Sequence, residues 1–122
     1  MIIKDIRTTA LSIPFTDPPR WSLDYNRPRE ILVVDIETTS GLTGMGYLMV
    51  LSGGLQTIKT CIEELLCPVV LGRSIWEVEA IWQDIWKATY WVGRMGVTVF
   101  AQSAIDIALW DALGKRAGLP LY

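Results

Sequence analysis

A length of 122 residues predicts one domain, long enough to bury a hydrophobic core but short for an α/β enzyme. The net charge is −2, with both signs mixed along the chain. Such a surface has no strong field of one sign, so neither nucleic acid nor an anionic membrane is expected as a partner.

The cysteines and the apolar segments indicate in which cellular compartment the protein is expected. No basic and apolar secretory leader opens the sequence, and no stretch is expected to approach the roughly twenty apolar residues of a membrane span. Cys61 and Cys67 are predicted to be reduced, buried thiols in a cytoplasmic protein. The alternatives are a disulfide, which is typical of extracellular proteins, or a metal pair, which would favour CxxC spacing and histidines.

The first half of the chain has β character. Ile, Val and Thr are frequent in residues 1–15 and 29–41, and the second segment alternates apolar with acidic residues. The glycine-rich TSGLTGMGY then predicts a tight hairpin into the strand YLMVL, and hence an antiparallel meander. A phosphate-binding loop is the alternative for GLTGMG, but its spacing is neither GxGxxG nor GxxxxGK[ST].

A long loop is predicted between the first two strands. The segment TDPPRWSLDYNRP contains three prolines together with Asp and Asn, a composition that cannot continue a β ladder. Loops of this length inside a small domain are usually functional or disordered. This segment is therefore the first place to look for a role.

The second half is predicted to be helical. A first helix covers 54–68 and stops at Pro68, and a second covers 74–91 and begins with a capping box of Ser74 and Glu77. The third carries a stripe of mostly small residues that would let another helix approach closely: Ala101, Ala104, Ile105, Ala108, Leu109 and Ala112. The fold class is α+β, a three-stranded antiparallel meander followed by an antiparallel three-helix bundle.

Two aspartates on the third helix could indicate chemistry. A separation of five residues puts Asp106 and Asp111 about 140° apart, so they cannot converge on one ion from this helix alone. Asp111 is expected to pair with Lys115, and Asp106 to bond to a group outside the helix. Without histidine no Ser/His/Asp or Cys/His arrangement is possible, so no catalytic residue and no metal ligand is predicted here.

Five tryptophans lie in the helical half: Trp76, Trp82, Trp86, Trp91 and Trp110. Trp82 and Trp86 are predicted to pack together rather than to form a cofactor box. One small bundle has few interior places for that much indole. Some of these side chains are therefore expected to face another surface as a partner interface.

The ending SAIDIALWDALGKRAGLPLY resembles the N-terminal signature of the mandelate racemase and muconate lactonizing group of the enolase superfamily, S-x-I-D-x-A-L-W-D-x-x-x-K-x-x-G-x-P-L. The matching residues are Ser103, Ile105, Asp106, Ala108, Leu109, Trp110, Asp111, Lys115, Gly118, Pro120 and Leu121. The resemblance covers the whole chain, because a three-stranded meander with a helical bundle forms that family's capping domain. Residues 1–122 are expected to be such a domain.

The resemblance implies a second domain that supplies the chemistry. In that family a modified (β/α) barrel follows, with Lys or His bases and the Asp/Glu ligands of Mg²⁺, which stabilises an enediolate formed by removing a proton next to a carboxylate. None of these groups is expected in residues 1–122, so the chain is expected to be a fragment or truncated product, inactive alone and without a bound cofactor. The expected partners are the barrel, a small carboxylate such as a sugar acid, and further copies in a homo-oligomer.

The resemblance also implies site residues. Loops equivalent to 16–29 and 51–54 close over the barrel mouth, orient the substrate and exclude water. The specificity-loop candidates are Arg20, Trp21, Tyr25, Arg29, Leu51 and Ser52, although the arginines are equally interpreted as solvated loop residues. The domain-junction candidates are Asp106, Trp110, Asp111 and Lys115.

Two functions from different classes follow. The first is the capping and specificity domain of a Mg²⁺-dependent enzyme, with a sugar-acid dehydratase or racemase favoured. The bases that distinguish dehydration, racemisation and cycloisomerisation would lie in the barrel. The second is a free-standing protein-interaction module without catalytic activity, because a capping domain without its barrel exposes an apolar face.

Overall fold

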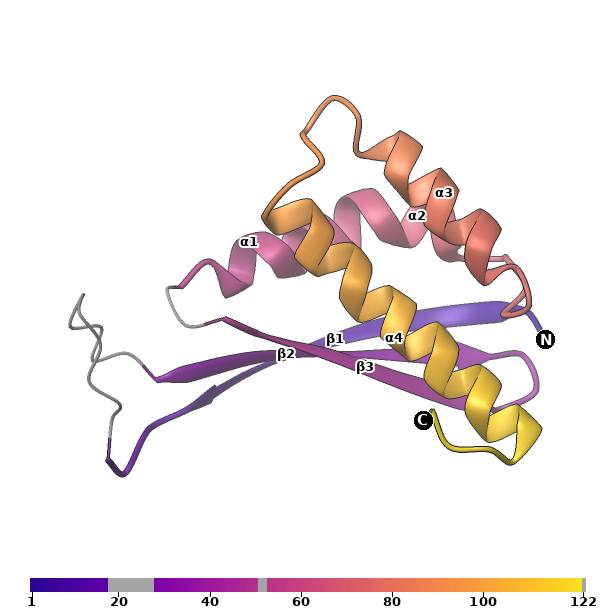
Figure 1. The fold of residues 1–122 in the computed structure, drawn as a ribbon, viewed down its shortest axis with the longest axis horizontal. Coiled ribbons are helices and arrows are strands. Elements are labelled where there is room, and N and C mark those ends of the chain that lie inside the picture. Colours follow the sequence, from indigo (N-terminus) through magenta and orange to yellow (C-terminus); the bar gives the residue numbers. More distant parts are fainter. Residues whose placement is uncertain (18–27, 51–52, 122) are drawn as a thin grey trace.

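The computed structural model describes residues 1–17, 28–50 and 53–121. All helical segments lie on one face of a three-stranded sheet, and α4 runs diagonally across that face (Figure 1). The α+β architecture of a meander followed by helices is therefore confirmed. The elements in chain order are β1 (Ile3–Ile13), β2 (Arg29–Thr38), β3 (Thr43–Val50), α1 (Leu55–Thr60), the π-helical η1 (Cys61–Leu66), α2 (Cys67–Val70), α3 (Val78–Ala88) and α4 (Val97–Ala117).

The sheet is an antiparallel meander in the order β1-β2-β3. Leu32, Val34 and Ile36 on the central strand are fully buried beneath the helices, as the alternation in the sequence predicts. The turn between β2 and β3 is short, and the Thr38 N–H donates to the Leu42 carbonyl across it at 2.9 Å. Gly41 adopts a φ of 81° in this turn, a conformation that favours glycine.

Gly44 and Gly46 do not belong to the hairpin turn, contrary to the prediction, because β3 already begins at Thr43. Both glycines face α4. A Cβ atom at Gly44 would lie 2.1 Å from the Ala108 carbonyl oxygen, and one at Gly46 would lie 2.0 Å from the Ala104 carbonyl oxygen. The small-residue stripe of α4 is thus confirmed as buried, and at Ala104, Ala108 and Ala112 it receives a strand.

The first helix does not stop at Pro68. The segments α1, η1 and α2 follow one another without a break from residue 55 to residue 70. Within this helix the Cys67 N–H bonds to the Ile62 carbonyl, five residues back, which is the π-helical pattern. Pro68 therefore lies at the start of α2, directly after the π-helical turn.

The second predicted helix is shorter than expected, since α3 begins at Val78 and ends at Ala88. Only half of the predicted capping box forms: the Ser74 N–H donates to the Glu77 carboxylate at 3.4 Å, while the Ser74 hydroxyl accepts from the Trp76 N–H. Arg73 also binds the Glu77 carboxylate, at 2.8 Å. Glu77 is therefore held before the helix rather than inside its first turn.

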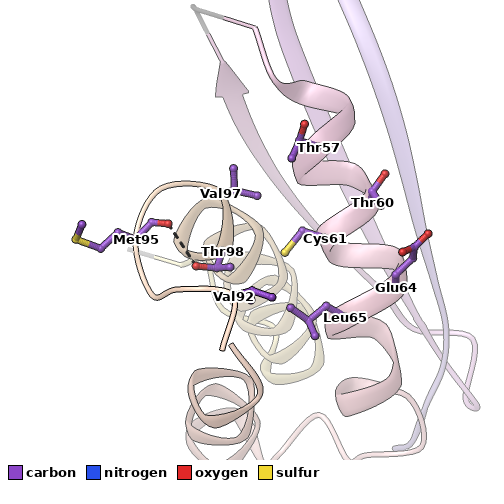
Figure 2. Close-up of a pocket in the computed structure, with 9 residues that line it drawn as sticks. All are labelled: Thr57, Thr60, Cys61, Glu64, Leu65, Val92, Met95, Val97 and Thr98. Atoms are coloured by element: carbon purple, nitrogen blue, oxygen red, sulfur yellow. Dashed lines mark hydrogen bonds between the residues drawn. The ribbon is translucent and has the colours of Figure 1, made fainter. Parts of the chain in front are cut away.

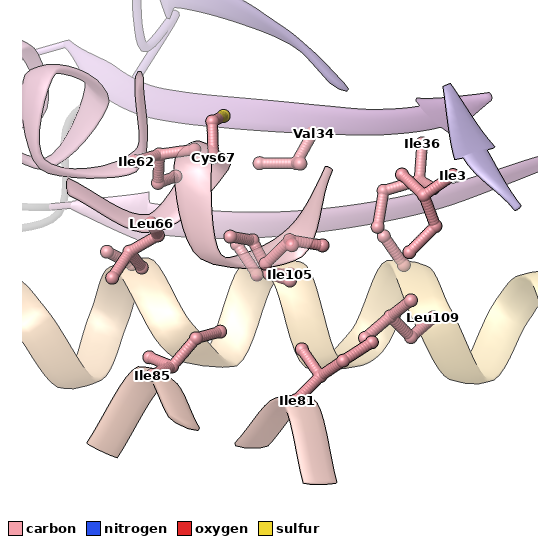
Figure 3. Packing of buried hydrophobic residues seen from close by; sticks show 14 of the residues in the cluster. Ile3, Val34, Ile36, Ile62, Leu66, Cys67, Ile81, Ile85, Ile105 and Leu109 are labelled. Atoms are coloured by element: carbon pink, nitrogen blue, oxygen red, sulfur yellow. The ribbon is translucent and has the colours of Figure 1, made fainter. Parts of the chain in front are cut away.

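The core lies between the sheet and the helices, with α4 at its centre (Figure 3). Ile105 and Leu109 of α4 belong to this core, and Ile81 and Ile85 of α3 lie on the side of α4 away from the sheet (Figure 3). By length and composition α4 could span a membrane, which corrects the expectation that no stretch approaches that size. Eight of its residues are buried within this domain, as in the core helix of a folded protein.

Candidate functional site

The two predicted specificity loops are attached to the same end of the sheet. Arg29 pairs with Ile13 at the start of β2, and the adjacent Glu30 pairs with Val50 at the end of β3. Arg29 is exposed, and its guanidinium lies over the Phe15 ring at 5.0 Å from the ring centroid. The other loop candidates, Arg20, Trp21, Tyr25, Leu51 and Ser52, lie outside the described residues.

Asp111 and Lys115 hold the outer edge of the sheet. They form the predicted i,i+4 ion pair at 2.7 Å. The Asp111 carboxylate also accepts from the Met45 N–H at 2.7 Å, and the Lys115 ammonium donates to the Thr43 carbonyl at 3.2 Å. These bonds satisfy backbone groups of the edge strand β3 that no other strand reaches, and so protect this edge from pairing with another chain.

Asp106 faces the opposite side of α4. It lines a hollow of about 280 Å³ together with Val78, Glu79, Trp82 and Trp110. Within the described part of the chain no hydrogen bond or ion pair reaches the Asp106 carboxylate, so the expected bond to a group outside the helix is not found. Burial, with a smaller contribution from the Glu79 charge, raises the pKa of Asp106.

A second hollow of about 670 Å³ separates α1 and η1 from the α3–α4 connection (Figure 2). Cys61 and Leu65 line one side, and Val92 and Met95 line the other. Burial raises the pKa of the Cys61 thiol, which favours its protonated form at neutral pH. Glu64 is the one carboxylate in this lining, and acid–base chemistry has no second group there.

The cysteines are free thiols, as predicted, but they are not equally buried. Cys67 lies in the core, where burial raises the pKa of its thiol to about 11. Cys61 is only partly buried at the wall of the larger hollow. The absence of a disulfide follows from their positions in one continuous helix.

Four tryptophans of the helical half are exposed, namely Trp76, Trp82, Trp91 and Trp110, and Trp86 is half-buried, so the expectation that some indole faces outward is confirmed. Trp82 and Trp86 stack with their ring centroids 5.5 Å apart, as predicted. Trp91 is 91% exposed on the α3–α4 connection, and Met95 of the same connection is 86% exposed. Arg94 covers the Trp86 and Tyr90 rings instead of the outer indole. A cluster of exposed apolar side chains on one connection is typical of an interface.

Mg²⁺ does not fit the residues described. Among them, no three Asp, Glu, Cys or His side chains come close enough to hold one ion. Several carboxylates of the described residues are already paired with Lys or Arg: Asp5, Glu37, Glu63, Glu77, Asp84 and Asp111. Asp106 and Glu79 line the same hollow, but the other lining side chains, those of Val78, Trp82 and Trp110, offer no oxygen ligands.

The residues that lie near Asp106 were not predicted from the sequence. Glu79 and Trp82 are three residues apart on α3, so they share one face of that helix. The sequence shows this spacing. It does not show that this face of α3 passes close to Asp106 and Trp110, because that depends on how α3 packs against α4.

Comparison with known proteins gives consistent results. A family model described as the N-terminal domain of mandelate racemase / muconate lactonizing enzyme matches residues 4–122. A D-mannonate dehydratase of Xanthomonas oryzae pv. oryzicola is 42% identical over 94 residues, which are 77% of this chain and 22% of the relative. A 3,6-anhydro-alpha-L-galactonate cycloisomerase of Streptomyces coelicolor is 35% identical over 126 residues, with 99% of this chain and 34% of the relative covered.

The solved structures agree. A racemase from Streptomyces coelicolor A3(2), crystallised with bound magnesium, superimposes with a TM-score of 0.85 at 35% identity, and the match covers 95% of this chain and 33% of that one. The chain therefore spans between about a fifth and a third of the length of the curated relatives it matches.

Proposed function

Because the chain belongs to the mandelate racemase / muconate lactonizing enzyme family, in which it is an N-terminal domain, we propose that residues 1–122 cap a Mg²⁺-dependent enzyme acting on a sugar acid. The whole enzyme removes the proton next to the substrate carboxylate, as a dehydratase or a racemase. The match along nearly the whole chain to relatives that are much longer carries this proposal.

The residues of this chain bind and orient the substrate rather than react with it. The described end of the sheet, where Arg29 pairs with Ile13 and Glu30 with Val50, supports both specificity loops from one rigid base. A guanidinium such as that of Arg29 can bind a carboxylate through two parallel hydrogen bonds. Loops held there exclude water from the barrel mouth, which strengthens the electrostatic interactions inside it.

The bases and the ligands of Mg²⁺ belong to the barrel domain in this proposal. When bound there, Mg²⁺ stabilises the negative charge that develops on the substrate carboxylate. Assembly as a homo-oligomer and a cytoplasmic location are further parts of the proposal. Light scattering of the full-length protein measures the first, and fractionation of cells measures the second.

A domain exchange tests the capping role. Residues 1–122 are fused to the barrel of the Streptomyces coelicolor cycloisomerase, and turnover of a panel of sugar acids is measured with Mg²⁺. We expect an active chimera whose substrate preference differs from that of the parent cycloisomerase. Arg29→Ala in the chimera should raise KM more than it lowers kcat, while Arg116→Ala, on the exposed last turn of α4, should change neither. A folded chimera with the parent's preference would contradict the specificity role.

A second candidate is a free-standing interaction module. The observation in its favour is the exposed apolar tip of Tyr90, Trp91, Val92 and Met95, which a partner would cover. Sedimentation of the chain alone and with a barrel domain in trans distinguishes the two functions. Self-association that the barrel abolishes supports the cap, whereas a stable monomer with no affinity for any family barrel supports the module.

A further inference from the structure

The hollow between α3 and α4, here the α3–α4 notch, combines charge with aromatic surface. Its lining residues are Val78, Glu79, Trp82, Asp106 and Trp110. Two acidic residues and two tryptophans therefore line one space of about 280 Å³. None of the paired carboxylates of the domain takes part in it.

The charge in the notch is not neutralised by the described residues. Neither Asp106 nor Glu79 makes an ion pair with any cation in residues 1–17, 28–50 or 53–121. The cations nearest in sequence to Glu79 are engaged elsewhere, since Arg73 binds Glu77 and Asp84, and Lys87 binds Asp84. Lys115, the cation nearest in sequence to Asp106, is paired with Asp111. A half-buried carboxylate beside a like charge is destabilising, and burial and Glu79 together raise the pKa of Asp106. A cation in the notch would remove both penalties.

The aromatic walls narrow the choice of cation. Trp82 and Trp110 are 41% and 45% exposed, so part of each indole is open to a ligand. Indole is the best aromatic partner for an organic cation and no ligand for Mg²⁺. A guanidinium combines a flat face that stacks on aromatic rings with a fork of N–H donors that matches a carboxylate. An ammonium offers a point charge and no such face.

The volume of the notch, about 280 Å³, suits one guanidinium side chain. It lies at the lower end of the range of small-molecule pockets, about 300 to 1,000 Å³, which largely enclose their ligand. We propose that the α3–α4 notch binds the guanidinium of an arginine presented by a protein partner, with Asp106 and Glu79 as its carboxylate acceptors and Trp82 and Trp110 as its aromatic walls. The notch would bind this group whether or not the chain caps a sugar-acid enzyme.

Titration with matched peptides tests the notch directly. The 122-residue chain is titrated with acetyl-Gly-Arg-Gly-amide and with the citrulline peptide of equal shape and no charge, and the indole N–H signals are followed by NMR. We expect saturable shifts of Trp82 and Trp110 with the arginine peptide. Binding of the citrulline peptide should be about tenfold weaker or more, the loss of a charge-assisted hydrogen bond. The pKa of Asp106 should fall when the arginine peptide is bound.

Variants locate the site. Asp106→Asn should weaken the arginine peptide about tenfold, and Trp91→Phe, which changes an exposed indole outside the notch, should leave its affinity unchanged. Glu79→Gln and the comparison of the two peptides on the unaltered chain decide the question if Asp106→Asn does not fold. Equal binding of both peptides, equal binding of a lysine peptide, or shifts confined to Trp91 would each overturn the proposal.

Discussion

The two sides of α4 differ in how completely their polar groups are satisfied. On the β3 side, Asp111 bonds to Lys115 and to a backbone N–H, and two glycines let the strand approach the helix backbone. On the α3 side, Asp106 faces another carboxylate across an open notch. The signature IDxALWD thus contains one aspartate that completes the fold and one that the described residues leave unneutralised. Two aspartates of the same motif therefore need not have the same role.

The difference has an energetic reason. Hydrogen bonds to the N–H groups of the edge strand and close packing of the strand on the helix stabilise the folded state. The residues that make these contacts therefore contribute to folding whatever the domain binds. A half-buried carboxylate without a cation lowers the stability of the folded state. Substitutions on the two sides should consequently change stability in opposite directions.

The largest effect is expected at the glycines of the β3 side. Gly46→Ala places a Cβ about where the Ala104 carbonyl oxygen lies, 2.0 Å away, and a backbone atom cannot move aside as a side-chain end can. We expect the free energy of unfolding to fall by about 3 kcal/mol or more, as in overpacked cores. Urea denaturation followed by circular dichroism measures it. Tyr47→Thr, on the exposed face of the same strand, is the control and should cost much less.

Asp111→Ala should have the next largest effect. It removes the acceptor of the Met45 N–H and the partner of Lys115, and we expect a loss of about 1 to 2 kcal/mol in the free energy of unfolding. Lys115→Ala should cost less, because its bonds are exposed. A double-mutant cycle separates the contribution of the ion pair, which we expect to be about 0.5 kcal/mol. No change in either variant would show that β3 does not need this edge protection.

Asp106→Asn should stabilise the domain, raising its free energy of unfolding by about 0.3 kcal/mol at pH 7. The folded state holds the Asp106 proton more tightly than the unfolded state, because burial and Glu79 raise the pKa above its ordinary value of 3.8. The carboxylate therefore lowers stability as the pH rises through the interval between 3.8 and the raised value. The gain from asparagine should be present above this interval and absent below it.

Urea denaturation of Asp106→Asn at pH 7 and at pH 3 tests this sign. Asp17→Asn, an exposed aspartate far from the notch in sequence, is the matched control and should change stability at neither pH. A loss of stability for Asp106→Asn at pH 7 would mean that the carboxylate has a favourable partner after all.

The smallest effect concerns Mg²⁺, for which neither side of α4 has a suitable set of ligands among the described residues. We expect no tight binding of Mg²⁺ to residues 1–122 in titration calorimetry, and no Mg²⁺-dependent exchange of the proton next to the carboxylate of any hydroxy acid in a panel. Deuterium incorporation that the chain alone catalyses and that chelation abolishes would show that the chemistry lies in this domain.

The sequence by itself determined the elements, because hydrophobic periodicity reports which face of an element is buried. The alternation of Leu32, Val34 and Ile36 predicted the buried face of the central strand. The apolar stripe of α4 predicted which residues of that helix enter the core. The i,i+4 spacing of Asp111 and Lys115 also sufficed for their ion pair, since it depends only on helix geometry. The family followed from the motif.

The tertiary structure alone decided what these elements meet. Gly44 and Gly46 were assigned to a turn, because a glycine-rich stretch gives the same local signal whether it bends the chain or lets a helix approach a strand. Pro68 was expected to end a helix that instead continues through a π-helical turn. The notch around Asp106 depends on the packing of α3 against α4. Such contacts join residues distant in sequence, and no local pattern encodes them.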